Sequence, residues 1–147
     1  GAAITDPSRQ VIGFLGDGGF QINIQELQTI IHYDLNIKII ILNNFGYGII
    51  KQFQDSYFES RYEATGRGYS QPDFKKIADA YGLRYESVDQ ISKIDQNFFS
   101  YEGPMIIDVF LDPNTLIEPK LEMGHAINDQ FPYLENSEKN SGNRFTN

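Results

Sequence analysis

Two short turns in this 147-residue chain place polar side chains among glycines. Residues 16–19 read Gly-Asp-Gly-Gly, and residues 43–48 read Asn-Asn-Phe-Gly-Tyr-Gly. Glycines allow backbone N–H groups to come close to phosphate oxygens, as in many phosphate-binding turns. A carboxylate at the centre of the first turn would repel a phosphate, so Asp17 needs a further explanation.

A divalent cation removes this conflict of sign. Mg²⁺ binds about six oxygens, of which proteins usually supply one or two while phosphates and water supply the rest. Asp17 would then link the protein through the metal to a diphosphate. An asparagine side-chain oxygen and a backbone carbonyl in residues 43–48 would complete the protein's share without adding charge. The two turns together therefore predict half of a metal–diphosphate site.

The hydrophobic pattern predicts the elements that position both turns. Residues 11–15 and 37–42 are short apolar runs, typical of strands buried on both faces of a parallel sheet. Apolar residues at helical spacing between them (Ile24, Leu27, Ile30 and Ile31) predict an amphipathic helix. Each turn then follows the carboxyl end of a strand, where ligands bind in doubly wound sheets. If the two strands are neighbours, both turns face the same crevice.

The rest of the chain continues to alternate helices and strands. The further predicted elements are a helix over residues 72–81 that ends at Gly82, a strand over 84–88, a helix over 91–99 and a buried strand over 105–110. The fold class is α/β, a doubly wound and mostly parallel sheet flanked by helices. Residues 49–71 are too long for an ordinary connection and are predicted to be a functional loop. Residues 134–147 are predicted to be a polar, disordered tail.

Composition excludes several classes of function. The formal charge of -8 and a pI near 4.6 leave no basic surface for nucleic acid or anionic lipid. The lack of cysteine excludes disulfides, thiolate metal sites and cysteine nucleophiles, and favours a cytoplasmic location. The longest apolar run is far shorter than the roughly 18 residues that span a bilayer. Since the chain starts at Gly1 without an initiator Met, we expect it to begin inside a longer gene product.

Other interpretations of the two turns are weaker. A Rossmann fingerprint that starts at Gly16 requires glycine where Gln21 stands, and no Gly-Lys-Ser/Thr sequence forms a Walker loop. Ordinary turn chemistry would explain either glycine-containing segment taken alone, but not their combination after two strands of one unit. His32 is predicted to be a surface residue. A pocket role stays open for His125, and neither histidine is assigned to catalysis.

The spacing of these turns resembles the thiamine diphosphate motif of the 2-oxo acid decarboxylase and acetolactate synthase superfamily. The resemblance implies a thiamine diphosphate-binding fold, with a pyrophosphate-binding domain over residues 1–133 that is truncated at its N-terminus. It implies that Asp17, Asn44 and the Gly46 carbonyl hold Mg²⁺ on the cofactor. The cofactor-binding residues that it implies are Gly16, Asp17, Gly18, Gly19, Asn44, Gly46, Tyr47 and Gly48.

Residues 47–62 resemble the acetolactate synthase branch of this superfamily. This implies decarboxylation of a 2-oxo acid such as pyruvate, followed by condensation with a second 2-oxo acid. Ile49 and Phe53 are expected to border the substrate pocket, and they stand where acetolactate synthases commonly have Met and Trp. Simple non-oxidative decarboxylation and a non-catalytic binding module are the alternatives that remain open.

The resemblance also implies partners outside this chain. The catalytic residue is unknown here, because the activating Glu of the family belongs to a pyrimidine domain that nothing in this sequence matches. That domain would come from the same protein or from a partner subunit of a homo-oligomer, such as a homodimer. The full-length protein would bind thiamine diphosphate and Mg²⁺, with FAD as a further possibility. We expect the 147-residue chain to be inactive alone.

Overall fold

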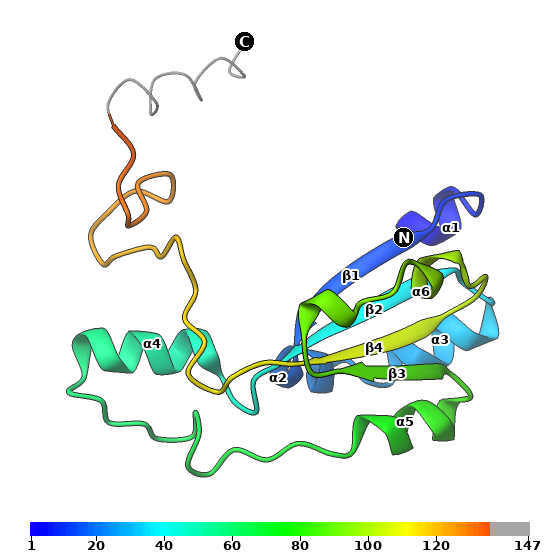
Figure 1. Cartoon of the computed structure of the whole chain (residues 1–147), viewed down its shortest axis with the longest axis horizontal. Coiled ribbons are helices and arrows are strands. Elements are labelled where there is room, and N and C mark those ends of the chain that lie inside the picture. Colours follow the sequence, from blue (N-terminus) through cyan, green and yellow to red (C-terminus); the bar gives the residue numbers. More distant parts are fainter. Residues whose placement is uncertain (136–147) are drawn as a thin grey trace. The chain divides into compact units, whose positions relative to one another are not determined.

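A computed structural model describes residues 1–135 of the chain (Figure 1). The residues form a first compact unit, Gly1–Thr115, and a second that begins at Leu116. The strands of the first unit are β1 (Val11–Gly16), β2 (Ile37–Asn43), β3 (Arg84–Val88) and β4 (Met105–Phe110). They form a 4-stranded, all-parallel sheet in the order β1-β2-β4-β3. The predicted parallel α/β sheet and its four predicted strands are therefore confirmed.

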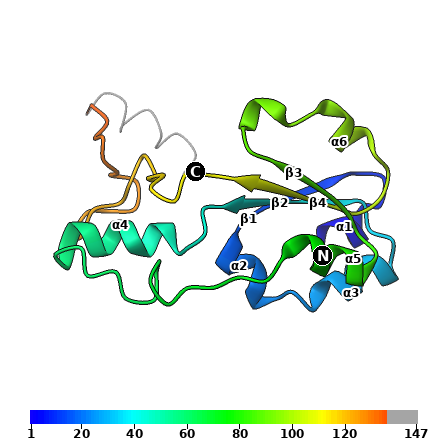
Figure 2. The same ribbon diagram turned by 60° about the horizontal axis from the view of Figure 1, so that its bottom comes forward.

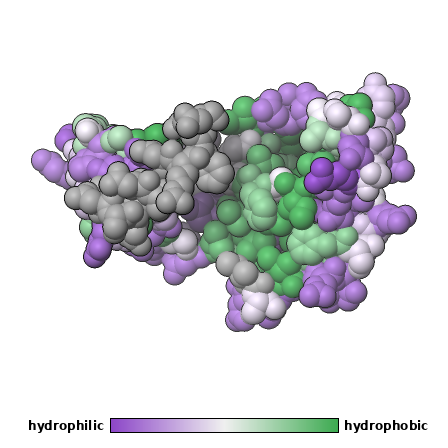
Figure 3. Space-filling view, turned by 90° about the horizontal axis from the view of Figure 1, so that it is seen from above, coloured by the Kyte–Doolittle hydropathy of each residue, from purple (hydrophilic) through white to green (hydrophobic). Residues whose placement is uncertain are grey.

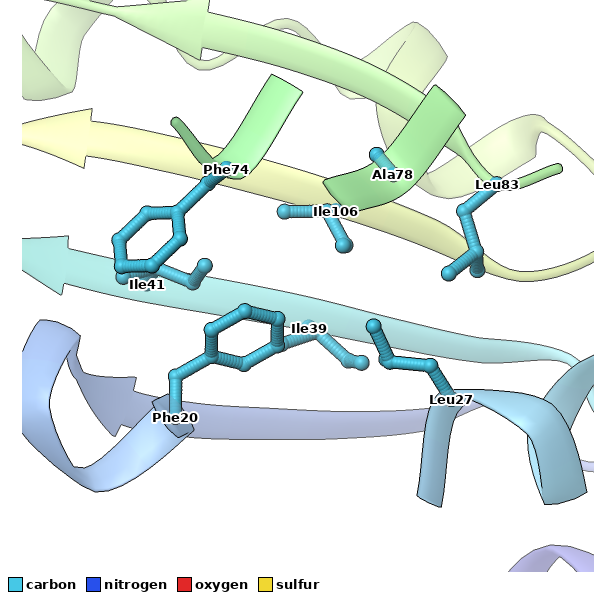
Figure 4. Close-up of a cluster of buried hydrophobic side chains, with 8 residues drawn as sticks. All are labelled: Phe20, Leu27, Ile39, Ile41, Phe74, Ala78, Leu83 and Ile106. Carbon is cyan, nitrogen blue, oxygen red and sulfur yellow. The ribbon is translucent and has the colours of Figure 1, made fainter. Parts of the chain in front are cut away.

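One face of the sheet is covered by α2 (Asp17–Ile22), α3 (Glu26–His32) and α5 (Phe74–Tyr81) (Figure 2). Apolar side chains of these helices meet Ile39 and Ile41 of β2 and Ile106 of β4 (Figure 4). The rings of Phe20 and Phe74 pack edge to face, with centroids 5.1 Å apart. Burial of these side chains holds the helices against the sheet, because removing apolar surface from water is the main favourable term in folding.

The opposite face carries a second apolar cluster. Met105, Ile107 and Val109 of β4 are fully buried there. The segment that contains α6 (Gln96–Ser100) covers them, with Phe98 and Phe99 packed against the cluster. Helical segments thus lie on both faces of the sheet, as the predicted doubly wound arrangement requires.

The ends of α5 follow directly from its sequence. The Asp73 side chain accepts a hydrogen bond from the Lys76 backbone N–H at 3.1 Å and caps the first turn. Gly82 ends the helix with a φ of 75°, a left-handed conformation that glycine adopts without steric cost. The predicted stop at Gly82 is confirmed.

Three predicted segments differ from the structure. Residues 49–71 are not all loop, because α4 (Gly48–Tyr57) is a helix none of whose side chains is buried. The single helix predicted over 91–99 is a 3-10 turn at Ile91–Lys93 followed by α6, since the Asp95 side chain caps a new helix by accepting from Asn97 N–H. The connection between β1 and β2 holds two short helices, α2 and α3, rather than one.

Strand β1 lies at the edge of the sheet and exposes apolar side chains. Ile12 and Phe14 are 44% and 66% exposed. The strand register places both on the same face of the sheet as the fully buried Met105 and Ile107 of β4. A space-filling view shows hydrophobic residues gathered on the surface seen from above (Figure 3). The cover over β4 therefore does not extend over β1 in the described part of the chain.

The second unit holds a small hydrogen-bonded loop. Lys120 and Phe131 exchange two backbone hydrogen bonds of 2.8 Å. Within the loop, His125 Nδ1 lies 3.1 Å from Asp129 Oδ2, and the His125 ring stacks on Tyr133. Most of the predicted tail over residues 134–147 lies outside the described residues. In the part of the chain that the structure describes, no helix is long and apolar enough to cross a membrane.

We expect the core of the first unit to respond strongly to truncation of Ile41, which is fully buried between the sheet and its helices. Ile41→Ala should lower the free energy of unfolding by about 2–5 kcal/mol through lost burial and the cavity left behind. Ile22→Ala, at a position that is 70% exposed, should change it by less than about 0.5 kcal/mol. Urea denaturation followed by circular dichroism measures both, and equal losses would contradict this description of the core.

Candidate functional site

Neighbouring strands bring the two glycine-containing turns together. Gly16 of β1 pairs with Leu42 of β2, so the residues that follow each strand start side by side. Asp17, the first residue of α2, is only 1% exposed. Its Oδ1 accepts a hydrogen bond from Gly18 N–H at 2.8 Å, and its Oδ2 accepts one from Gly46 N–H at 3.0 Å. The Asp17 carboxylate therefore joins the first turn directly to the second.

The second turn is shaped by Asn43, which ends β2 and is 1% exposed. Its Oδ1 accepts a hydrogen bond from Phe45 N–H at 3.3 Å, across a residue spacing typical of Asx turns. Phe45 has a φ of 59°, in the left-handed region that aromatic residues seldom adopt. Asn44 is half-buried, and its side-chain Nδ2 lies 2.3 Å from the position that a Cβ on Gly48 would occupy.

Other groups approach several glycines of the turns closely. A Cβ on Gly18 would lie 2.3 Å from Tyr47 Cε1, so the ring of the second turn packs against the first. A Cβ on Gly46 would lie 2.4 Å from the Thr65 carbonyl oxygen. Gly16 and Gly19 have open space at the corresponding position. The contact at position 46 is with backbone, so it calls for glycine there, whereas a Cβ at position 18 or 48 would displace the Tyr47 or Asn44 side chain. Close packing does not explain glycine at positions 16 and 19.

Two residues in the segment after α4 hold the second turn, and sequence reasoning did not single them out. Thr65, which is buried, accepts a hydrogen bond from Tyr47 N–H at its carbonyl and donates from Oγ1 to Gln54 Oε1 at 2.8 Å. The Tyr69 ring meets the Tyr47 ring edge to face, with centroids 5.1 Å apart. Burial, together with the Asp17 charge, raises the pKa of the Tyr69 hydroxyl. The one sequence signal for these contacts was the unusual length of residues 49–71.

A buried carboxylate, that of Asp108 in β4, lies beneath the second turn and was also missed. Asp108 is 2% exposed, and its Oδ1 accepts from Asn43 Nδ2 at 3.1 Å. Its Oδ2 accepts from the Tyr85 hydroxyl at 2.9 Å. Burial raises the pKa of the Asp108 carboxyl, and the hydrogen bonds from Tyr85 and Asn43 oppose that rise. An aspartate inside the apolar run of residues 105–110 was the available signal.

The remaining predicted residues lie on exposed surface. Ile49 and Phe53 of α4 are 64% and 40% exposed, and the Phe53 ring packs against Tyr57 at a centroid distance of 4.7 Å. Their place beside a substrate pocket stays a prediction. His32 is exposed, as predicted. His125 belongs to the second unit, where Asp129 and Tyr133 are its partners.

The residues of the two turns fit a metal-bound diphosphate. The Asp17 carboxylate accepts two backbone N–H bonds and also interacts with the Tyr69 hydroxyl. A carboxylate offers about four lone-pair sites, so it has room for a cation beside these donors. Residues 1–135 contain no cluster of three or more His, Cys, Asp or Glu residues that could hold a metal. A cation at Asp17 would therefore depend on amide, carbonyl, phosphate and water oxygens for its other ligands, which is the hard-oxygen environment that Mg²⁺ prefers.

The fold is an α/β domain in which two turns meet at the carboxyl ends of two neighbouring parallel strands, the place where ligands bind in sheets of this kind. Residues 1–109 match the family model for the thiamine pyrophosphate enzyme, C-terminal TPP binding domain. The chain therefore belongs to the thiamine pyrophosphate enzyme family and contains its C-terminal TPP-binding domain. The family that the sequence motif implied is confirmed.

Similar proteins include acetolactate synthases from several organisms. The chain is 39% identical to the acetolactate synthase of Arthrospira platensis, over 89% of this chain and 23% of that protein. It is 38% identical to the acetolactate synthase large subunit of Cyanidium caldarium, over 86% of this chain and 22% of that protein. The chain thus spans less than a quarter of the length of these relatives.

One similar solved structure is a thiamine diphosphate-dependent 4-hydroxybenzoylformate decarboxylase from Rhodococcus jostii RHA1. It superposes with a TM-score of 0.67 at 30% sequence identity, over 76% of this chain and 21% of that one. The likeness supports the predicted fold class and shows that the same fold occurs in a decarboxylase.

Gly46→Ala tests the close approach of the second turn to Thr65. The added Cβ would meet a backbone oxygen 2.4 Å away, so the turn must shift, and we expect a loss of about 1–3 kcal/mol in the free energy of unfolding. Gly19→Ala is the matched control, because it adds the same group in open space within α2. It should be neutral or stabilising by up to about 1 kcal/mol. Urea denaturation that gave equal losses would contradict the assigned packing.

The raised pKa of Asp108 predicts a pH dependence of stability. The folded chain binds the Asp108 proton more tightly than the unfolded chain. Protonation of Asp108 therefore adds to the free energy of unfolding, and this stabilisation is fully present at pH values below 3.8, the ordinary pKa of an aspartate. It is lost as pH rises through the raised pKa of the folded state. The unfolding free energy of the wild type, measured relative to Asp108→Asn, should therefore fall with increasing pH. A difference that stays constant from acid to neutral pH would contradict the assignment.

Proposed function

We propose that this chain is the diphosphate-binding part of a thiamine diphosphate- and Mg²⁺-dependent enzyme that condenses 2-oxo acids after decarboxylation. The observation that carries the proposal is the 3.0 Å hydrogen bond from Gly46 N–H to Asp17 Oδ2. It brings the acidic turn and the asparagine-containing turn to one place, as a shared metal–diphosphate site requires. Membership of the TPP-binding family supports the choice of diphosphate.

Three oxygens of the chain would hold the metal: an Asp17 carboxylate oxygen, the Asn44 side-chain oxygen and the Gly46 carbonyl oxygen. Backbone N–H groups of Gly18 and Gly19, at the start of α2, would meet the phosphates, and the Gly18 N–H would then share its bond to Asp17 Oδ1 with a phosphate oxygen. The other proposed cofactor contacts are Gly16, Tyr47 and Gly48. Thiamine diphosphate supplies, when bound, the nucleophilic carbon that attacks the carbonyl of a 2-oxo acid. The role of this chain is to bind and orient the cofactor.

Condensation is the preferred activity because the similar proteins named above are acetolactate synthases at 38–39% identity. The whole enzyme would then take pyruvate as a donor and draw its activating Glu from a pyrimidine domain, of the same protein or of a partner subunit. Non-oxidative decarboxylation is a second candidate, favoured by the likeness to the Rhodococcus decarboxylase. The products distinguish them, since condensation of pyruvate yields acetolactate and decarboxylation yields an aldehyde.

Thermal melting with thiamine diphosphate and Mg²⁺ tests the site. Ligand at a hundredfold its Kd should stabilise the wild-type chain by about 2.7 kcal/mol and raise the melting midpoint by several degrees. Asp17→Ala should abolish this gain, because it removes the only carboxylate of the proposed metal ligands. Chelation of Mg²⁺ with EDTA should abolish it in the wild type.

Asp79→Ala is the matched acidic control. Asp79 lies on the exposed surface of α5, where it forms an exposed ion pair with Lys75, and the variant should keep the full shift. The proposed site is wrong if Asp17→Ala retains the shift, or if thiamine diphosphate stabilises the wild type equally without Mg²⁺.

A further inference from the structure

The side chain of Asn43 uses both ends of its amide in the interior. Its Nδ2 donates to Asp108 Oδ1 at 3.1 Å, while its Oδ1 accepts from Phe45 N–H at 3.3 Å. Asp108 is held from the other side by the Tyr85 hydroxyl at 2.9 Å. Three side chains from neighbouring strands β2, β4 and β3 thus form one chain of hydrogen bonds that ends at the second turn, with Asn43 and Asp108 buried and Tyr85 half-buried.

Asp108 decides which way the Asn43 amide points. In the reversed orientation, the amide oxygen would face the Asp108 oxygen, and the NH₂ group would face the Phe45 N–H. Both contacts would then be repulsive, and buried polar groups would lose their partners, at a cost that exceeds the worth of an ordinary hydrogen bond. Since Asp108 Oδ1 acts as an acceptor here, only one orientation of Asn43 is satisfied.

The orientation of Asn43 in turn supports the backbone of the second turn. Phe45 lies in the left-handed region, and its N–H is bonded to the Asn43 side chain. The next N–H, that of Gly46, donates to Asp17 Oδ2. Two of the three residues that the proposed function assigns to the metal, Asn44 and Gly46, flank Phe45 directly.

We propose that Asp108 is a positioning residue of the cofactor site, which orients the Asn43 amide and thereby holds the turn that presents Asn44 and Gly46. Asp108 itself touches no ligand in this arrangement and acts only through Asn43. The inference rests on the proposed function for its consequence at the metal. Its first step, the support of the turn by Asp108, is a property of the chain without any ligand.

Amide hydrogen exchange on the ligand-free full chain tests the first step. Asp108→Ala removes the acceptor of Asn43 Nδ2, so the Phe45 and Gly46 N–H groups should exchange roughly tenfold faster, which corresponds to the loss of one buried hydrogen bond. Asp108→Asn should restore protection to within about threefold of the wild type. Its introduced amide can accept from Asn43 and donate to the Tyr85 hydroxyl, which both donates and accepts.

Val88→Ala is the control for general destabilisation. Val88 is buried in the cluster on the other face of the sheet, so its truncation lowers stability without touching Asn43. Residues of β2 should lose protection equally in Val88→Ala and Asp108→Ala, whereas Phe45 and Gly46 should be affected selectively by Asp108→Ala. If Asp108→Ala does not fold, Tyr85→Phe combined with Asp108→Leu makes the same test without an unpaired buried hydroxyl. Unchanged or merely uniform exchange at Phe45 and Gly46 overturns the proposal.

Binding of Mn²⁺, used as a Mg²⁺ probe, tests the second step, the effect of Asp108 on metal binding by the turn. Titrations with thiamine diphosphate present, followed by the electron paramagnetic resonance of free Mn²⁺, should give about a tenfold weaker Kd for Asp108→Ala and a near wild-type Kd for Asp108→Asn. Equal affinity in the wild type and Asp108→Ala overturns the link to the metal. A wild-type chain that binds no Mn²⁺ with thiamine diphosphate instead overturns the proposed function, and the exchange experiment still decides whether Asp108 supports the turn.

Discussion

The arrangement of the site depends on one hydrogen bond between two turns. The Gly46 N–H group donates to the Asp17 carboxylate, which lies at the start of α2 and is almost fully buried. A carboxylate in the interior is costly unless donors surround it, and here backbone N–H groups of both turns supply them. The same contact is possible only because β1 and β2 are neighbours and parallel, so that their carboxyl ends lie at one edge of the sheet. Topology and charge compensation are therefore linked at this point.

A chain of hydrogen bonds runs from Tyr85, near the start of β3, through Asp108 of β4 to Asn43 at the carboxyl end of β2. Asp108 accepts hydrogen bonds from Tyr85 and Asn43, and the Asn43 side chain accepts one from Phe45 N–H in the turn. Among residues 1–135, no buried side-chain nitrogen or oxygen atom lacks a hydrogen-bond partner. Such a fully satisfied network favours one side-chain arrangement over its alternatives, because a reversed amide leaves several groups unpaired at once. The apolar clusters on both faces stabilise the sheet, whereas this network gives the edge its particular geometry.

The family of this chain is known from its sequence, and the residues of its turns are explained by their packing. Similarity to the C-terminal TPP-binding domain places the chain in a family. Geometry explains two of the glycines in the turns: the Thr65 carbonyl requires glycine at position 46, and the Tyr47 ring packs where a side chain at position 18 would lie. The exposed apolar side chains of β1 and α4 are not explained by contacts within the described part of the chain.

Local patterns in the sequence were enough to determine the strands, the stop of α5 at Gly82 and the two turns, because β-branched runs, capping residues and glycines act over a few neighbouring positions. They did not determine α4. None of its residues is buried, and its mixture of polar and aromatic residues resembled a loop. Nor did they identify Asp108 and Thr65, which act on a turn that is distant in sequence. Their roles depend on β4 lying between β2 and β3 and on the segment after α4 folding back to Tyr47. Only the tertiary structure decides such contacts. They arise from the order of the strands in the sheet and from the path of the segment after α4, and not from the conformational preferences of neighbouring residues.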